Sequence, residues 1–186
     1  KGFKFFFDKK VPLVKLIDRT FNCDSKRAVE IVNYIIENST VTKVHFEIEA
    51  SILTDELISV LNSAPKDMFQ IEVGVQTINH EALTAVNRNY DLEKIRYNIR
   101  RLTEPKNIHI HLDLIAGLPF EDYNSFIKSF NFVYSMSPDM LQLGFLKVLK
   151  GTQVSERFTS DIKYAEFPPY EVISTKWISA SELLKL

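Results

Sequence analysis

Two kinds of hydrophobic pattern alternate along the chain. Short runs rich in β-branched residues are separated by longer stretches in which apolar residues recur at every third or fourth position. The short runs predict strands and the longer stretches predict amphipathic helices. Strands are expected at 11–17, 41–50, 68–76, 107–117 and 140–149, and helices at 25–39, 53–64, 91–104 and 124–137.

The order of these elements predicts an α/β fold. Asn22 or Asp24 is expected to cap the first helix and Thr54 the second, because short polar side chains accept hydrogen bonds from free backbone amides. A strand, helix, strand rhythm gives parallel strands, since each helix returns the chain to the same edge. Five strands are too few for a closed eight-unit barrel. The sequence therefore predicts an open α/β sheet or an arc of an incomplete barrel, with ligands at the carboxyl ends of the strands.

Polar residues interrupt nearly every predicted strand. Such strands are expected to be almost wholly apolar when both faces of a parallel sheet are covered. Taken singly, the polar residues have plain explanations: Glu49 or His45 can face solvent, and His109 can be a satisfied core histidine. Taken together they predict a cavity that holds a polar ligand. They are Glu47 and Glu49, Glu72 and Gln76, His109, His111 and Asp113, and Gln142.

The stretch HLDLIAGLPFED places Asp113 near the end of an apolar strand and a turn directly after it. A carboxylate at that end of a parallel strand can hold a ligand hydroxyl or ammonium group. Gly117 is expected to adopt a positive φ or to let a ligand approach the backbone. Glu121 and Asp122 are expected in the first turn of the next helix, where negative charge suits the helix dipole.

Composition excludes several classes of protein. The formal net charge of the 186-residue chain is −1, so no long-range attraction to nucleic acid or acidic membranes is expected. No apolar run approaches the ~20 residues of a membrane span. The motifs GxGxxG, GxxxxGK[ST] and GxSxG are absent, which excludes a glycine-loop nucleotide site and a hydrolase nucleophile elbow.

The single cysteine, Cys23, is the firmest constraint. It allows no intrachain disulfide and no cysteine-built metal site, and it fits a reducing compartment such as the cytoplasm. It is expected to be a packed or helix-edge thiol. The chain also begins without Met and with the basic, aromatic stretch KGFKFFFDKK, which indicates a piece of a longer protein.

Two further motifs carry a resemblance to a known family. The segments IEVGVQTINHEALTAVNRNYDLEKI and HIHLDLIAGLPFEDYNSFIKSF resemble the radical S-adenosylmethionine (radical SAM) enzymes. The shared elements are a GVQ strand, an NR pair and a DLIxGLPxE strand and turn. The likeness is to the branch with oxygen-independent coproporphyrinogen oxidase, tRNA methylthiotransferases and cobalamin-domain radical enzymes. It covers roughly residues 1–155.

This resemblance implies a partial TIM-type (β/α)6 barrel, of which strands two to six are present. It also implies a parent enzyme that cleaves S-adenosylmethionine reductively at a four-iron four-sulfur cluster, giving a 5′-deoxyadenosyl radical. Cobalamin in the parent, and an electron donor such as flavodoxin or ferredoxin, are implied in the same way. Mapped by motif, the cofactor contacts are Glu47, Gln76, Arg88 and Asp113, with backbone groups near Leu146 and Lys147 facing adenine.

The chain departs from the family pattern in two places. The CxxxCxxC cluster motif is absent, and DRTFN stands where a GGE-type stretch is usual. The chain alone is therefore expected to be catalytically inactive. Residues 1–150 are predicted to form the partial barrel and residues 151–186 a C-terminal extension, and the exposed edge strand at 11–17 is a predicted surface for self-association.

Two alternative functions remain open from the sequence. One is a TIM-like metal-dependent enzyme that uses His109, His111 and Asp113, with Glu47 as a further candidate ligand. The other is an α/β binding or assembly module without catalytic activity. The substrate of the parent protein does not follow from the sequence.

Overall fold

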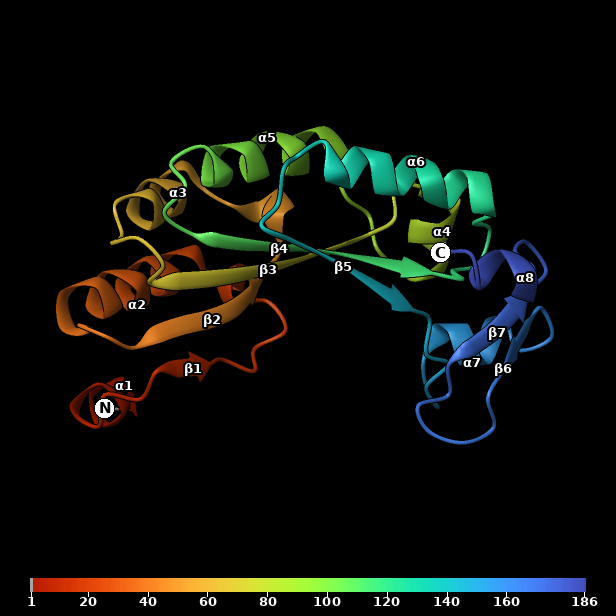
Figure 1. Cartoon of the computed structure of the whole chain (residues 1–186), viewed down its shortest axis with the longest axis horizontal. Helices are drawn as coiled ribbons and strands as arrows, with labels where there is room; N and C mark the ends of the chain where they lie inside the picture. The colour runs from red at the N-terminus through yellow and green to blue at the C-terminus, as the bar shows by residue number, and fades with distance from the viewer. Residues whose placement is uncertain (1) are drawn as a thin grey trace. The chain divides into compact units, whose positions relative to one another are not determined.

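The computed structural model describes residues 2–186 and contains a five-stranded sheet (Figure 1). Neighbouring strands in the sheet are also neighbours in the chain, which confirms the predicted βαβ repetition. The registers of the first two pairings are parallel, with Val14 opposite Val44 and Phe46 opposite Ile71. The strands are β1 (Leu13–Lys15), β2 (Lys43–Ile48), β3 (Phe69–Gln76), β4 (His109–Ala116) and β5 (Met140–Phe145).

The first strand is much shorter than predicted. The backbone N–H of Leu16 still donates to the carbonyl of His45, but the chain then leaves the sheet and Ile17 is 97% exposed. The prediction of a strand over 11–17 is wrong for its ends, because the strand covers only Leu13–Lys15. β1 is one edge of the sheet.

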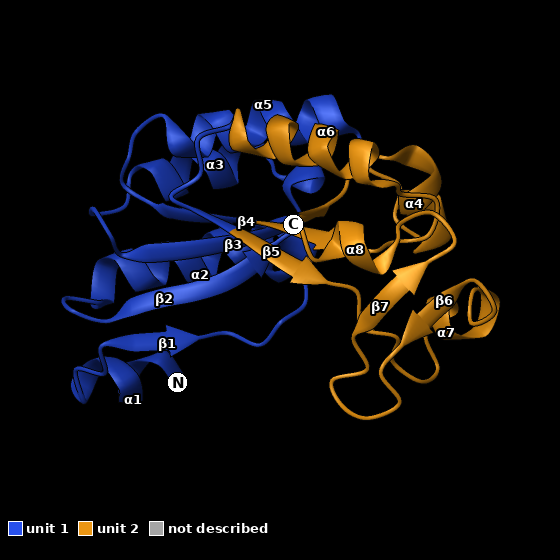
Figure 2. Ribbon diagram, turned by 45° about the vertical axis from the view of Figure 1, so that its right-hand side comes forward, with its two compact units in different colours: residues 1–74, 91–112, 136–141 blue, residues 75–90, 113–135, 142–186 orange. Residues whose placement is uncertain are grey.

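Contacts divide the chain into two compact units, each built from several segments (Figure 2). Unit 1 comprises residues 1–74, 91–112 and 136–141, and unit 2 comprises residues 75–90, 113–135 and 142–186. The predicted division into 1–150 and 151–186 stays a prediction.

Unit 1 packs its helices on the apolar side chains of β2 and β3. Asp24 and Thr54 cap α2 (Ser25–Asn38) and α3 (Asp55–Asn62), as the sequence predicts. The ring of Phe46 lies 4.3 Å from that of Phe21 and 5.7 Å from that of Phe69, at the centre of the core. The unit also contains α1 (Gly2–Asp8), η1 (Phe21–Cys23), η2 (Ala50–Ile52) and α5 (Leu92–Thr103).

Strict alternation along β3 and β4 separates an apolar face from a polar one. In β3 the residues at 69, 71, 73 and 75 are buried, and in β4 those at 110, 112, 114 and 116 are buried. The residues between them are partly exposed and include the polar side chains of both strands. The period of two that predicted these strands is confirmed.

Unit 2 contains a second, antiparallel pair of strands that the sequence pattern did not predict. β6 (Ile162–Tyr164) pairs with β7 (Val172–Thr175), and the chain after β5 runs beside residues 170–172. The backbone N–H of Val148 donates to Tyr170, and that of Val172 donates to Leu146. The helices of this unit are α4 (His80–Ala85), α6 (Tyr123–Tyr134), α7 (Gln153–Arg157) and α8 (Ala180–Leu183).

The turn after β4 explains the glycine at its centre. Gly117 has φ +85°, and a Cβ at this position would lie 2.8 Å from a methyl carbon of Val172. Both the positive φ and the close approach of Val172 therefore require glycine here. No helix within residues 2–186 is long and apolar enough to cross a membrane.

Candidate functional site

A cavity of about 490 Å³ lies within unit 2 where β3, β4 and β5 end. Gln76 and Asp113 both line it, as do the predicted residues Leu146 and Lys147. Four of the six predicted site residues thus share one cavity. Its other lining residues are Leu114, Ile115, Gln142, Leu143, Gly144, Phe145 and Glu171.

Gln76 combines a rare backbone conformation with a buried side-chain oxygen that has no hydrogen-bond partner among the described residues. It has φ +68°, in the left-handed region that few residues other than glycine adopt. Its side-chain oxygen Oε1 is buried and accepts no hydrogen bond from any residue that the structure describes. A buried polar atom without a partner is destabilising, so this oxygen has an unmet requirement for a hydrogen-bond donor.

The segment after β5 contributes differently from what the sequence predicted. The backbone N–H of Leu146 donates to the carbonyl of Ala116, and its carbonyl accepts from Val172. The backbone of Leu146 is thus engaged in strand pairing. Lys147 is paired with Glu171 in an antiparallel β-bridge, and its carbonyl accepts from the N–H of Leu149. The predicted backbone contact of Leu146 and Lys147 to adenine stays a prediction.

Arg88 does not line the cavity. Its guanidinium donates to the Tyr90 hydroxyl at 2.5 Å and lies 5.6 Å from the centre of that ring. The expected contact between Arg88 and a ligand carboxylate stays a prediction. Glu47 lies in unit 1, exposed on β2 and opposite Glu72 in the register.

Glu49 follows β2 rather than belonging to the strand. Its carboxylate accepts from the backbone N–H of Ser51 at 3.0 Å and caps η2. The side chain of Asn22 fixes the backbone of Glu49 from both sides, donating to its carbonyl and accepting from its N–H at 2.9 Å each.

Three histidines gather on the polar face of unit 1. His45 is buried, and its Nε2 lies 3.2 Å from a carboxylate oxygen of Glu72. The ring of His111 lies 4.7 Å from that of His109 and 6.0 Å from that of His45. Burial, followed by the neighbouring histidines His109 and His45, lowers the pKa of His111 below its ordinary value. Within residues 2–186 no group of three histidine, cysteine or acidic side chains is placed to hold a metal ion, so the geometry does not support the metal-dependent alternative.

Glu121 is the functional candidate that the sequence interpretation missed. The prediction that it lies in the first turn of a helix is wrong, because α6 begins at Tyr123 and Asp122 is its N-cap. Glu121 is instead fully buried, and its Oε1 accepts from the hydroxyls of Thr77 at 2.5 Å and Ser129 at 3.1 Å. Burial raises the pKa of Glu121 to about 7, although both hydroxyl bonds oppose the shift.

A signal for this network was present in the sequence. The residues at 69, 71, 73 and 75 face the core, and the same alternation places Thr77 on the buried side of the chain. A hydroxyl on that side needs a partner. What the sequence could not give was the partner, which lies 44 positions further along the chain.

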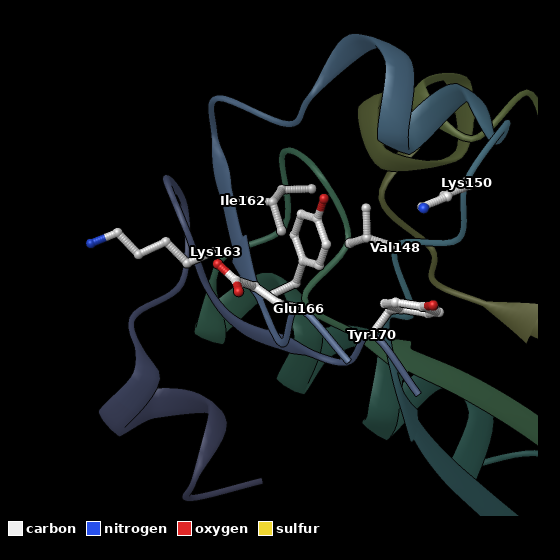
Figure 3. A pocket seen from close by; sticks show the side chains of 7 residues that line it. Val148, Lys150, Ile162, Lys163, Glu166 and Tyr170 are labelled. Atoms are coloured by element: carbon white, nitrogen blue, oxygen red, sulfur yellow. The ribbon is translucent and has the colours of Figure 1, made fainter. Parts of the chain in front are cut away.

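A second cavity, of about 430 Å³, lies in unit 2 beside the β6–β7 pair (Figure 3). Val148 and Tyr170 line it, whereas their neighbours Lys147 and Glu171 line the first cavity. Because side chains alternate across a strand, the paired segments 146–148 and 170–172 form a wall between the two cavities. The rest of its lining is Lys150, Ile162, Lys163, Tyr164 and Glu166, and Figure 3 shows the amino group of Lys163 pointing away from it.

Comparison with known families identifies the fold and the relatives. The profile of the Radical SAM superfamily matches residues 4–133, which is more than half of the chain. The chain belongs to the radical SAM superfamily. Members of this superfamily are enzymes that use S-adenosylmethionine and an iron–sulfur cluster, which agrees with the resemblance carried by the GVQ and DLIxGLPxE motifs.

The curated relatives of this radical SAM chain are much longer than it is. A tRNA-2-methylthio-N(6)-dimethylallyladenosine synthase of Buchnera aphidicola is 28% identical over 140 residues, covering 74% of this chain and 32% of the relative. The protein of that name in Thermotoga petrophila is 26% identical over 114 residues, covering 61% of this chain and 26% of the relative. The chain thus spans about a third of the length of the first of these relatives and less of the second.

Solved structures confirm the predicted fold class, the partial (β/α)6 barrel of the radical SAM enzymes. Coproporphyrinogen III oxidase from Escherichia coli, a radical SAM enzyme, superposes with a TM-score of 0.69 and 19% identity, covering 94% of this chain and 38% of that one. The methyltransferase TsrM from Kitasatospora setae, solved with cobalamin and a [4Fe-4S] cluster, gives a TM-score of 0.73 and 14% identity, covering 90% and 34%.

The residues of this chain do not fit the iron–sulfur cluster itself. The sequence holds one cysteine, and an iron–sulfur cluster requires several thiolates. Cys23 ends η1 and is exposed, so of the two predicted environments the helix edge is right and the packed site is wrong. The cavity of Gln76 and Asp113, by contrast, offers polar groups that suit the hydroxyl and amino groups of S-adenosylmethionine.

Proposed function

We propose that this chain supplies part of the S-adenosylmethionine site of a radical SAM enzyme. The observation that carries the proposal is the buried, unpartnered Oε1 of Gln76 in a cavity that Asp113 also lines. Membership of the radical SAM superfamily gives the ligand its identity, because S-adenosylmethionine is what this family binds.

The chemistry of the cavity suits the nucleoside end of the cofactor. Its volume of about 490 Å³ falls within the usual range of small-molecule pockets. The Gln76 oxygen accepts from a ligand hydroxyl or amino group, and the Asp113 carboxylate accepts from a neighbouring one. Ile115 lies on the same strand face as Asp113 and offers an apolar surface for a flat ring.

Catalysis belongs to the longer protein in this proposal. When S-adenosylmethionine and the cluster are bound, the pair supplies a 5′-deoxyadenosyl radical by reductive cleavage. The lone Cys23 cannot ligate such a cluster, so we expect the 186-residue chain alone to be inactive. Other cysteine ligands, an electron donor such as flavodoxin or ferredoxin, and a cytoplasmic location are part of the proposal for the parent protein.

The substrate of the parent protein is not fixed by these observations. Its relatives are named for tRNA modification, and its structural neighbours include a coproporphyrinogen oxidase and a cobalamin-containing methyltransferase. Cobalamin in the parent is proposed from the likeness to TsrM and from the branch that the motifs resemble.

Calorimetry with S-adenosylmethionine tests the proposal on the chain as it stands. We expect weak binding, because the iron that would chelate the amino acid end is missing. Gln76→Ala and Asp113→Ala should each weaken binding by about tenfold, since loss of one hydrogen bond to a charged or buried group costs about 1.5 kcal/mol.

His109→Ala is the matched control, because it removes a polar side chain from the same strand as Asp113 but outside the cavity. It should leave the dissociation constant within about twofold of the unmodified chain. Binding that survives the double variant Gln76→Ala and Asp113→Ala, or that His109→Ala weakens equally, would overturn the assignment.

A further inference from the structure

Gln76 holds an unusual backbone conformation at the last position of β3. Its φ of +68° is one that non-glycine residues rarely adopt, and it must be maintained by the residues around it. Directly after it, the N–H of Thr77 donates to the carbonyl of Val75 at 2.9 Å and closes a tight turn. The contacts of residues 77–79 therefore decide where the Gln76 amide points.

Two hydroxyl groups fix the backbone of that turn. The Thr77 hydroxyl oxygen accepts from the N–H of Asn79 at 2.9 Å, and the Ser129 hydroxyl oxygen accepts from the N–H of Ile78 at 3.1 Å. Each hydroxyl also donates its own hydrogen to Oε1 of Glu121. One carboxylate oxygen thus orients both hydroxyls, and through them two consecutive N–H groups after Gln76.

The side chain of Asn79 fastens the same turn to the segment that carries Glu121. Its amide donates to the carbonyl of Phe120 at 2.9 Å and to the hydroxyl of Ser125 at 3.0 Å. Its oxygen accepts from the N–H groups of Glu81 and Ala82 and caps α4. Hydrogen bonds from the Asn79 side chain therefore join the turn after β3 to the turn after β4.

Burial of the Glu121 carboxyl group is energetically costly. It is fully buried, Oε2 has no hydrogen-bond partner among the described residues, and the nearest charge that acts on it is the like charge of Asp122. Its pKa, raised to about 7, reflects that cost. A glutamine could accept the same two hydroxyl bonds without a buried charge, so the bonds rather than the charge are what the role of Glu121 requires.

We propose that Glu121 is a positioning residue for the cofactor cavity: by orienting the Thr77 and Ser129 hydroxyls, it holds Gln76 in the left-handed conformation that presents its amide to the ligand. This rests on the proposed function in so far as the ligand is S-adenosylmethionine. The effect of Glu121 on the backbone conformation of Gln76 does not depend on a bound ligand.

Nuclear magnetic resonance of the isotope-labelled chain tests directly whether Glu121 maintains the positive φ of Gln76. A positive φ gives a strong intraresidue nuclear Overhauser effect between the amide proton and Hα, and the Gln76 signal should show it. Glu121→Leu, which removes both acceptors, should lose this signal and weaken adenosine binding by about tenfold. Glu121→Gln, which keeps one acceptor oxygen, should keep the signal and bind adenosine within about threefold of the unmodified chain.

Asp122→Ala is the matched control, because it deletes the adjacent carboxylate and the α6 cap without touching Thr77. It should lower stability yet leave the Gln76 signal and the adenosine affinity unchanged. If Glu121→Leu does not fold, Thr77→Val decides, since it removes the same bond from the other side.

A folded Glu121→Leu or Thr77→Val chain that keeps the Gln76 signal would overturn the positioning role. Failure of the unmodified chain to bind adenosine would count against the proposed function instead, while the Gln76 signal in the variants would still decide the role of Glu121.

Discussion

The two halves of strands β3 and β4 carry polar side chains on the same alternating pattern, but they use them differently. In the first half, within unit 1, Glu72 pairs with His45 at 3.2 Å. In the second half, within unit 2, the oxygen of Gln76 is buried without a partner in the described chain. A polar group that finds its partner inside the protein contributes to stability, whereas a buried one without a partner is destabilising.

The comparison is not absolute, because Nδ1 of His45 is also buried without a hydrogen bond. When Nε2 of a neutral imidazole carries the proton and donates to Glu72, Nδ1 is left as an acceptor alone. The histidine therefore has its one donor satisfied. Gln76 lines a cavity, and its buried side-chain oxygen has no hydrogen-bond partner among the described residues.

The largest effect on stability is expected in unit 2, at the turn after β4. Gly117→Ala should lower the free energy of unfolding by about 3 kcal/mol, because it adds a strained positive φ to an overlap with Val172. Gly144→Ala is the control, since a Cβ there would meet only the Leu114 carbonyl at 3.6 Å, an ordinary contact. Urea unfolding of both variants measures the difference. Equal losses of unfolding free energy in the two variants would show that the positive φ and the approach of Val172 do not require glycine at position 117.

Stability should also fall as pH rises, through Glu121. A carboxyl whose pKa is raised from 4.5 to about 7 binds more protons in the folded than in the unfolded chain between those values. Stability from this group is therefore full below about pH 4.5 and is lost as pH rises towards 7, by an amount of the order of 3 kcal/mol.

Glu121→Gln should remove this dependence, so its unfolding free energy should change less than that of the unmodified chain over the same pH range. Burial is the main cause of the raised pKa of Glu121, and Asp122, which adds to it, is present in both proteins. If the unfolding free energies of the two proteins changed equally with pH, the pH dependence would not come from Glu121.

A pair of substitutions separates stability from binding in the two halves of β3. Glu72→Gln should lower stability by about 1 kcal/mol, since it weakens the contact to His45, and should leave S-adenosylmethionine binding unchanged. Gln76→Met should leave stability unchanged or raise it slightly, because it removes an unpartnered buried oxygen, while binding falls. Thermal unfolding and calorimetry on both variants measure the contrast, and the reverse outcome would refute it.

The smallest effect concerns the edge of the sheet in unit 1. β1 is an edge strand of three residues, and its first residue, Leu13, is 38% exposed. Leu13→Lys should reduce self-association at high concentration without a measurable change in stability, because charge discourages edge pairing. Light scattering across a concentration series checks this. If the unmodified chain is monomeric at every concentration, the predicted self-association is wrong.

Local pattern was enough to predict most of the fold. Period-two runs gave β2 to β5, and short polar residues gave the caps Asp24 and Thr54. The pattern failed where neighbours in space decide the outcome. Ile17 reads as part of a strand but lies beyond the end of β1 and is 97% exposed, and the short β6–β7 pair depends on contacts rather than on a strong alternation.

The candidate site was predicted in part for the same reason. Gln76 and Asp113 follow from strand alternation together with the rule that ligands meet the carboxyl ends of parallel strands. Glu121 could not be placed by its own neighbourhood, because Asp122 next to it is an exposed cap and the two residues read alike. Its burial depends on Thr77, a contact that the linear pattern does not contain.

Chemical-shift mapping of S-adenosylmethionine on the labelled chain tests the central claim most directly. We predict that titration shifts the amide signals of Gln76, of residues 113–117 and of residues 142–147, while those of His45, Glu72, His109 and His111 stay unchanged. Shifts centred on the three histidines, or no shifts at any concentration, would contradict the account.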